Sequence, residues 1–312
     1  MSLSIDMLSA FVKVAERRSV SAAALDLGVS KSVLSKRIAQ LETTLHTTLF
    51  SRSTRRIALT PAGEAYLAHA HRALSAIGDG EEQLRSMQAE LTGKIRLTAP
   101  VSWGQRVLSA VLPEFVHLHP GIEIDLVLGD RIMDLAFERI DIALRWSPQA
   151  PGDTVAIPIA SIDWVIAASP GYLASAGTPV EPSDLQGHPG LCYWRKDSEE
   201  SWVFERMGER VQVSMRSRYR VDNPEAVTQA ALAGLGVGLL PGYLCEDALS
   251  EGSLVRLLPA WKPVTQFGEA ITAVAPPERM RLARNQVLVE FLKQRLASPE
   301  TRAVKRRPDT RH

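Results

Sequence analysis

Residues 11–42 read FVKVAERRSVSAAALDLGVSKSVLSKRIAQLE, and this stretch decides the fold of the N-terminal part of the chain. At its start an apolar side chain recurs at spacings of three and four: Leu8, Phe11, Val12 and Ala15. Such spacing places the side chains on one face of a helix. We therefore predict a helix over residues 5–18, with Ser4 as its N-cap.

The second half of the stretch predicts two helices joined by a tight turn. Ser19 is expected to cap a short helix that runs to Leu27, and Ser30 a longer one from Lys31 to about Leu45. Gly28 and the following valine form the turn, because glycine adopts the positive φ that such turns often need. This order of short helix, turn and longer helix is typical of a helix-turn-helix.

The longer helix carries two different faces. Leu34 and Ile38 are predicted to face inward, against Phe11 and Leu25. The outward face then presents hydrogen-bond donors for phosphates and base edges: Lys31, Ser32, Ser35, Lys36 and, at its flank, Arg37. A helix fits the major groove of DNA, which makes this face a candidate DNA-reading surface. A solvated basic face is an equally good interpretation of this helix taken alone.

The next stretch favours the DNA-binding interpretation. LFSRSTRRIALTPAGEAYL, residues 49–67, predicts a strand, a basic turn, a second strand and a new helix capped by Thr60 with Pro61 at its first position. Arg52, Arg55 and Arg56 lie at the turn, where they are expected to contact phosphates or enter a minor groove.

These two stretches resemble the winged helix-turn-helix of LysR-type transcriptional regulators, and the match over residues 3–67 has no gaps. The resemblance implies a DNA-binding domain over residues 1–60 with Ser30–Gln40 inside its recognition helix. It implies double-stranded promoter DNA as a partner. The family's usual Gln-Pro opening of that helix is replaced here by Lys31-Ser32.

Residues 61–91 predict one long helix, which would span about 45 Å at 1.5 Å per residue. Its apolar positions are Tyr66, Leu67, Ala70, Leu74, Ile77, Leu84, Met87 and Leu91. Such a stripe needs a covering partner, and the resemblance implies another copy of the chain, in a homodimer or homotetramer. Packing on the chain's own C-terminal domain is the alternative. Gly78-Asp79-Gly80 weakens the helix and allows a bend.

From Lys94 onward, short apolar runs alternate with helical stretches, which predicts an α/β fold with parallel sheets. In the first repeat we predict a helix over residues 130–140, and in the second a single strand over residues 213–221. This part resembles the LysR-type effector domain, which has a two-subdomain fold like that of periplasmic binding proteins. The resemblance implies an effector domain over residues 92–297. Its expected parts are subdomain I (92–162 and 268–297) and subdomain II (163–267), followed by a disordered basic tail (298–312).

A crevice between the two halves is the expected binding site for a small-molecule effector. Free amides of Val101–Gly104 and the Ser102 hydroxyl at one strand-to-helix junction, and Asn223-Pro224-Glu225 at another, favour an anion. The resemblance places these residues near the crevice: Thr98, Pro100, Val101, Ser102, Asp130, Trp146, Asn223 and Ala226. Ordinary helix capping is the alternative for each junction. Trp103, Trp146, Trp194 and Trp202 are candidates for stacking on an aromatic ligand, although tryptophan more often belongs to the core.

Composition limits the remaining possibilities. Among 312 residues, 45% are hydrophobic and 23% charged, and neither a membrane-spanning run nor a signal peptide is seen, so a cytoplasmic protein without a membrane partner is expected. Residues 1–60 hold nine Lys or Arg and four Asp or Glu, whereas residues 61–297 carry seven net negative charges. This asymmetry suggests that only the N-terminal part meets a polyanion.

Enzymatic chemistry finds little support. The seven histidines are scattered without chelating spacing, GLGVG at residues 234–238 stands between a helix and a strand, and no metal or cofactor is predicted. A free-standing solute-binding protein has no use for the N-terminal part. A thiol redox sensor based on Cys192 or Cys245 is a further alternative, weakly supported by Arg195 and Lys196. The sequence therefore predicts a transcriptional regulator that responds to a small, anionic effector.

Overall fold

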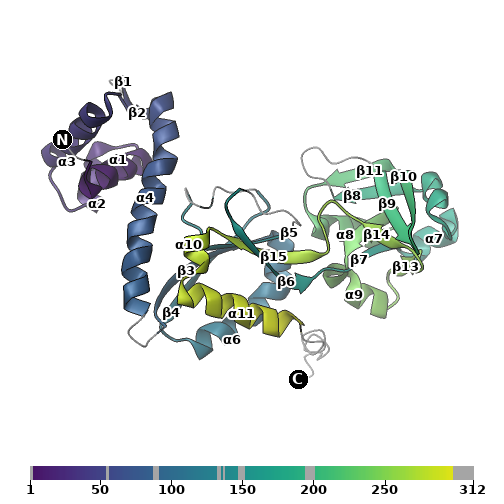
Figure 1. The fold of residues 1–312 in the computed structure, drawn as a ribbon. Coiled ribbons are helices and arrows are strands. Elements are labelled where there is room, and N and C mark those ends of the chain that lie inside the picture. Colours follow the sequence, from purple (N-terminus) through teal and green to yellow (C-terminus); the bar gives the residue numbers. More distant parts are fainter. Residues whose placement is uncertain are drawn as a thin grey trace, which may run out of the picture.

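The computed structural model in Figure 1 describes most of the chain in three successive parts. The described residues are 3–53, 56–86, 91–131, 135, 138–146, 152–193 and 201–297; within them, the side chains of 52, 53, 56, 79 and 81–86 are not described. We call the helix-turn-helix part up to residue 60 the head and the part from residue 91 onward the body. A long helix, α4 (Pro61–Ser86), leads from one to the other.

The head consists of three helices and a two-stranded wing: α1 (Ile5–Arg17), α2 (Val20–Asp26), α3 (Lys31–Leu45), β1 (Phe50–Ser53) and β2 (Arg56–Leu59). All three predicted N-caps are confirmed. The hydroxyls of Ser4, Ser19 and Ser30 accept hydrogen bonds from backbone amides three residues further on. Gly28 has a φ of 63°, as the predicted turn requires.

The core of the head confirms most of the predicted inward face. Phe11 and Leu34 are fully buried and Ile38 is nearly so. Leu25 was expected to pack with them, and this prediction is wrong, because its side chain is 83% exposed. The small side chains of Ala23 and Ala24 are buried in its place. Helix α2 therefore approaches its neighbours through alanines, and Leu25 on the next position points away.

The start of α4 is tied to the wing. Thr60 caps the helix as predicted, since its hydroxyl accepts from Gly63 N at 3.0 Å. A Cβ added at Gly63 would lie 2.2 Å from the carbonyl oxygen of Leu49, so this close approach of backbones requires glycine. Residues 78–80 remain helical.

The apolar stripe of α4 is buried near the start of the helix and more exposed further along. Leu67 and Ala70 are buried against the head, with Leu74 packed partly behind them. Ile77, one turn further along, is 39% exposed. The first half of the stripe thus has a partner inside the chain. The side chains of Leu84 and Met87 lie outside the described residues, and Leu91 follows the helix.

The first lobe of the body is built on a five-stranded sheet in the order β4-β3-β5-β15-β6. Its elements are β3 (Gly93–Ala99), α5 (Val101–Trp103), η1 (Gly104–Leu108), α6 (Ser109–Leu118), β4 (Ile122–Leu128), β5 (Ile142–Trp146), β6 (Val155–Ser161), β15 (Ala270–Ala275), α10 (Pro277–Met280) and α11 (Ala283–Ala297). Helices α6 and α11 meet through Phe115 and Phe291, whose ring centroids are 5.2 Å apart.

The second lobe has a five-stranded sheet in the order β11-β8-β12-β7-β13 and a three-stranded sheet in the order β10-β9-β14. Its elements are β7 (Trp164–Ala168), α7 (Pro170–Ala176), η2 (Pro182–Gly187), β8 (Pro189–Tyr193), β9 (Ser201–Arg206), β10 (Glu209–Ser214), β11 (Arg216–Val221), α8 (Pro224–Leu232), β12 (Val237–Pro241), α9 (Gly242–Ser250), β13 (Val255–Leu257) and β14 (Lys262–Val264). The chain enters this lobe after β6 and leaves it before β15.

Three predictions for the body need correction. The sheets are mixed rather than parallel, because β15 runs antiparallel to β5 and β6, and β7 antiparallel to β12. The predicted strand 213–221 is two strands in different sheets, with Met215 between them. The described residues of the predicted helix 130–140 form bends and turns, and Ile140 N donates to Leu135 O across Arg139, whose φ is 53°.

Within the described residues, no helix combines the length and the apolar character needed to span a membrane. The predicted tail, residues 298–312, lies outside the described residues.

Candidate DNA-binding and effector-binding sites

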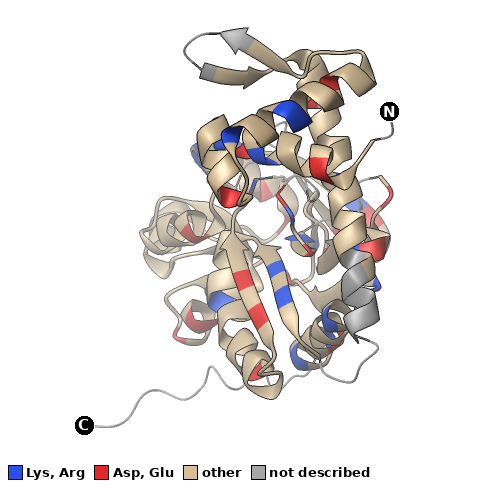
Figure 2. Ribbon diagram, turned by 90° about the vertical axis from the view of Figure 1, so that its left-hand side faces the viewer, with Lys and Arg blue, Asp and Glu red and all other residues tan. Residues whose placement is uncertain are grey.

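Helix α3 presents one exposed face. Leu34, Ile38 and Leu41 anchor it in the head, and the opposite side faces solvent. Four of the five predicted DNA-reading residues are exposed there: Lys31, Ser32, Ser35 and Lys36. Figure 2 shows Lys and Arg segments on the helices of the head, interspersed with acidic ones. The structure thus brings these four donors together on one helix face.

Two of the predicted donors already have intramolecular partners. The guanidinium of Arg37 is ion-paired with Asp6 at 2.6 Å, which ties α3 to the start of α1. The Oγ of Ser32 lies 2.9 Å from the Oγ of Ser30, the N-cap of the helix. Both interactions are exposed, so a DNA phosphate can compete with them.

Sequence reasoning missed Val33 on the same helix. Its amide donates to Ser30 Oγ at 3.3 Å and its side chain is 42% exposed. An exposed apolar side chain next to basic donors suits contact with the C5-methyl group of thymine. The sequence position of Val33 could have indicated this exposure. It stands one residue before the buried Leu34, so on a helix its side chain does not share the inward face.

The wing is held to α3 through a carboxylate. Glu42 Oε1 accepts from Leu49 N at 2.7 Å and from Phe50 N at 3.1 Å. In the wing, Arg52 pairs with Ile57 and Ser53 with Arg56. This register puts Arg52 and Arg56 close to the hairpin turn, as predicted from the sequence. Arg55 lies outside the described residues.

The first strand-to-helix junction of the body is closed by internal hydrogen bonds. Val101 N, expected to be free for a ligand, donates to Asp130 Oδ1 at 3.2 Å. Thr98 is fully buried, and its hydroxyl accepts from Arg145 at 3.1 Å. Pro100 precedes α5 without a side-chain cap. The structure thus brings Thr98, Pro100, Val101 and Asp130 together around the end of β3.

The second junction has the geometry of an ordinary N-cap. Asn223 Oδ1 accepts from Ala226 N at 3.2 Å at the start of α8. The last residue of the motif, Glu225, forms an ion pair with Arg106 of η1. Since Arg106 belongs to the first lobe and Glu225 to the second, this pair joins the two lobes near the two predicted junctions.

A second contact between the two lobes involves Ser102. This side chain is 2% exposed, and its Oγ lies 3.0 Å from the phenolic oxygen of Tyr243 on α9. Burial raises the pKa of Tyr243 above its usual range, so the hydroxyl remains protonated. Tyr243 was not among the effector-binding residues predicted from the sequence.

Four tryptophans were considered for ligand stacking. Among those that the structure describes, only Trp146 has a ring in contact with aromatic rings of both lobes. Trp103 is buried in the core of the first lobe and Trp202 in that of the second. Trp194 lies outside the described residues. Trp146 is also buried, at 4% exposure in the same core cluster as Trp103, but its ring contacts residues of both lobes, so it is the better candidate.

Two cavities occur elsewhere in the body. The larger, of about 580 Å³, lies between β7, the β9 hairpin and the segment that leads into β14. The smaller, of about 220 Å³, adjoins it, and four residues line both: Asp163, Trp164, Lys262 and Pro263. Neither is lined by any of the eight predicted effector residues.

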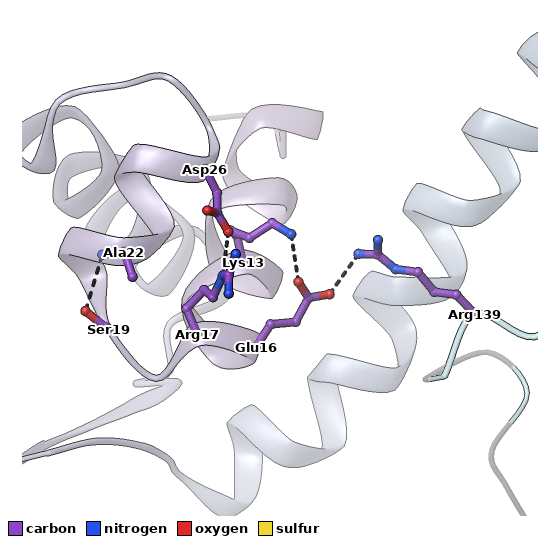
Figure 3. Close-up of polar contacts among 7 residues, drawn as sticks. All are labelled: Lys13, Glu16, Arg17, Ser19, Ala22, Asp26 and Arg139. Carbon is purple, nitrogen blue, oxygen red and sulfur yellow. Dashed lines mark hydrogen bonds and ion pairs between the residues drawn. The ribbon is translucent and has the colours of Figure 1, made fainter. Parts of the chain in front are cut away.

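The head also contacts the body within the same chain, which the sequence did not predict. Arg139, in the turn before β5, is ion-paired with Glu16 of α1 at 2.8 Å (Figure 3). Glu16 also binds Lys13 at 2.8 Å. Further along, Arg279 binds Asp141 at 2.8 Å and donates to Ser75 of α4. Two body segments thus hold α1 and α4.

The two cysteines lie in the interior of the body. Both cysteines are buried, and burial raises the pKa of Cys245 to about 12. A thiol with such a pKa is protonated at neutral pH and reacts slowly with oxidants. In the described part of the chain, no three His, Cys, Asp or Glu gather as a metal site.

Comparison with known proteins agrees with this architecture. Residues 5–64 match the model of the bacterial regulatory helix-turn-helix protein of the lysR family, and residues 88–297 that of the LysR substrate-binding domain. The HTH-type transcriptional regulator PtxR of Pseudomonas aeruginosa is 35% identical over 294 residues, which cover 94% of this chain and 93% of PtxR.

Two solved full-length structures are similar in both sequence and fold. CrgA, a LysR-type regulator from Neisseria meningitidis, is 26% identical with a TM-score of 0.60, over 96% of this chain and 100% of CrgA. The Vibrio cholerae virulence activator AphB is 25% identical with a TM-score of 0.58, over 93% and 98% of the two chains.

The chain belongs to the LysR family of transcriptional regulators. Members of this family bind DNA through the helix-turn-helix and small-molecule effectors through the substrate-binding domain. The relatives of this chain are transcriptional regulators of that family and not enzymes.

Proposed function

We propose that this protein binds promoter DNA as a homodimer or homotetramer and changes its binding when a small anionic effector enters the body. The observation that carries the proposal is the exposed donor face of α3, held in place by the fully buried Leu34 and Leu41. A rigid helix with exposed donors fits the major groove without rearrangement.

Within this surface we assign two roles. Ser32, Ser35 and Lys36 read base edges, with Lys31 and Arg37 at the flanks of the same face. Arg52, Arg55 and Arg56 of the wing contact phosphates. Phosphate contacts position a protein on the duplex and contribute to affinity for every sequence, whereas base contacts discriminate between sequences.

For dimerisation we propose the part of the α4 stripe beyond the head, of which the Ile77 side chain is described. Ile77 lies beyond the part of the helix that the head covers, and it is 39% exposed. A second copy of α4 would remove this side chain from water, as in a coiled coil. Two heads held in this way present two α3 helices to successive turns of DNA.

For the effector we propose the crevice between the lobes, where Ser102 and Asn223 stand at strand-to-helix junctions. Asp130 already occupies the amide of Val101 with a carboxylate oxygen. In this proposal an effector carboxylate takes the place of Asp130 as the acceptor of this amide. Entry also requires the Ser102–Tyr243 contact to separate.

The link from effector to DNA runs, in this proposal, through the contacts between head and body. Arg139 lies nine residues after Asp130 in the chain and binds Glu16 of the head. An effector that displaces Asp130 would alter the segment that carries Arg139. The effector then shifts the population of head orientations by as much as its affinity for the two arrangements differs.

The test is footprinting of the full-length protein on duplexes selected from a random-sequence library. Two protected half-sites should lie about 34–36 Å apart, or at a multiple of that spacing. A footprint confined to one half-site at saturating protein would contradict the proposal.

A further inference from the structure

Five aromatic side chains meet where the two lobes of the body join. Trp146 is at their centre. The centroid of its ring lies 5.7 Å from Tyr193, 5.8 Å from Trp164, 6.2 Å from Phe267 and 6.4 Å from Tyr243. Interplanar angles of 60–83° make these contacts tilted or edge-to-face, the arrangement that aromatic pairs prefer.

The cluster is assembled from both lobes. Trp146 is the last residue of β5 in the first lobe, whereas Tyr193 is the last residue of β8 and Tyr243 the second residue of α9 in the second lobe. Any separation of the lobes therefore parts Trp146 from these two rings. It exposes flat apolar faces on both sides of the same crevice, next to the Ser102 hydroxyl.

Trp146 differs from its neighbours in hydrogen bonding. Its indole Nε1 is buried and has no acceptor among the described residues. Trp164 Nε1, in contrast, donates to Gly268 O at 2.8 Å, and Trp261 Nε1 to Glu181 Oε2 at 2.9 Å. Buried indole N–H groups normally have a partner, so this donor is suited to an acceptor that enters with a ligand.

Polar groups complete this side of the crevice. Ser102 Oγ and the protonated Tyr243 hydroxyl are hydrogen-bonded to each other at 3.0 Å, and each can turn to a ligand oxygen when the lobes part. The crevice thus combines ring faces with three separate hydrogen-bonding groups: one indole and two hydroxyls.

We propose that the effector is an aromatic carboxylate whose ring inserts between Trp146 and the tyrosines of the second lobe, with an oxygen that accepts from Trp146 Nε1. The inference rests on the proposed function, because it names the chemical class of that function's effector. When the lobes part, a flat ring can stack on Trp146 and on the tyrosines at the same time, whereas a saturated ring or a short aliphatic acid offers no π-face to either side.

The experiment is calorimetric titration of the full-length protein with benzoate, salicylate, phenylacetate and indole-3-acetate. Each is compared with acetate and with a saturated acid of similar size, such as cyclohexanecarboxylate. At least one aromatic acid should bind about fivefold or more tightly than its saturated counterpart, because aromatic contacts add to apolar burial. Trp146→Phe, which keeps a ring and removes the N–H, should weaken that binding about two- to tenfold.

Trp202→Phe is the matched control, since Trp202 is buried in the core of the second lobe. It should leave the affinity for the aromatic acid unchanged. The inference is overturned if no aromatic acid binds better than its saturated counterpart, or if Trp146→Phe and Trp202→Phe have equal effects on binding. DNA binding by the same samples separates the two proposals: intact DNA binding with no aromatic preference rejects the ligand class alone.

Discussion

The head and the body hold their functional residues in opposite ways. In the head, Lys36 and Ser35 are exposed on a helix that is anchored from behind. In the body, Ser102 is 2% exposed and Trp146 4% exposed, and both side chains contact residues of the other lobe. A surface of the first kind binds a large, rigid partner as it stands. A site of the second kind must open for its ligand, so ligand entry and domain movement are coupled.

The largest effect is expected from a substitution that leaves a cavity in the core of the head. Leu34→Ala should destabilise the head by about 2–5 kcal/mol, because Leu34 is fully buried. DNA binding should fall, while the body keeps its own unfolding transition in calorimetry. Leu25→Ala is the control: Leu25 is 83% exposed, so stability should change by less than about 0.5 kcal/mol. Equal losses from both changes would refute the packing of α2 described above.

Removal of one base-reading side chain should have the next largest effect. Lys36→Ala is expected to cost about 1–3 kcal/mol in binding to a selected duplex and to relax its sequence preference. Arg52→Ala should instead weaken specific and non-specific binding alike and reduce the dependence of affinity on salt. Titrations at several salt concentrations separate the two. An altered sequence preference in Arg52→Ala, with an unchanged salt slope, would reverse the proposed roles.

A smaller effect is expected in the crevice. Ser102→Ala removes the hydroxyl that faces Tyr243 and should weaken effector binding by about 0.5–1.5 kcal/mol, or up to about 3 if it contacts a charged group. Ser109→Ala is a suitable control, because the Ser109 hydroxyl bonds only locally, to Gly104 O at 2.8 Å. Calorimetric titration with the effector measures both. Equal losses would mean that the change acts through the helix and not through the crevice.

The smallest expected effect concerns the contact between head and body. Arg139→Gln breaks a partly exposed ion pair, which is worth about 0.2–1 kcal/mol. The measurable consequence is a weaker coupling between effector and DNA binding, with each affinity nearly unchanged. Glu16→Gln breaks the same pair from the other side, so the double variant Glu16→Gln with Arg139→Gln should reduce the coupling no further than either single change. If the two losses add, the residues do not act through their ion pair.

The same contrast explains what could be predicted from the sequence. Ser30 as an N-cap, Gly28 at positive φ and Thr60 at the start of α4 all follow from interactions within a few residues, and local rules predict them well. Leu25 was misplaced because helical spacing alone does not say which side of a short helix meets its neighbours.

The crevice depends on contacts between distant residues. Ser102 and Tyr243 are separated by 141 positions, and Arg139 and Glu16 by 123. No local pattern pairs such residues, since the sheet topology and the two crossings between lobes bring them together. The resemblance to the family indicated Ser102 but not Tyr243. The mixed strand directions of the two five-stranded sheets could not be predicted from the sequence either.

The most direct test of the contrast is an equilibrium titration of one selected, fluorescently labelled duplex without effector. Wild type, Lys36→Ala and Ser102→Ala are compared as full-length proteins. If the head is preformed for DNA binding and the effector site is separate from it, Lys36→Ala should lose about fivefold or more in affinity, while Ser102→Ala should match the wild type. A comparable loss in Ser102→Ala would show that Ser102 supports the fold or assembly needed for DNA binding, and would contradict the account.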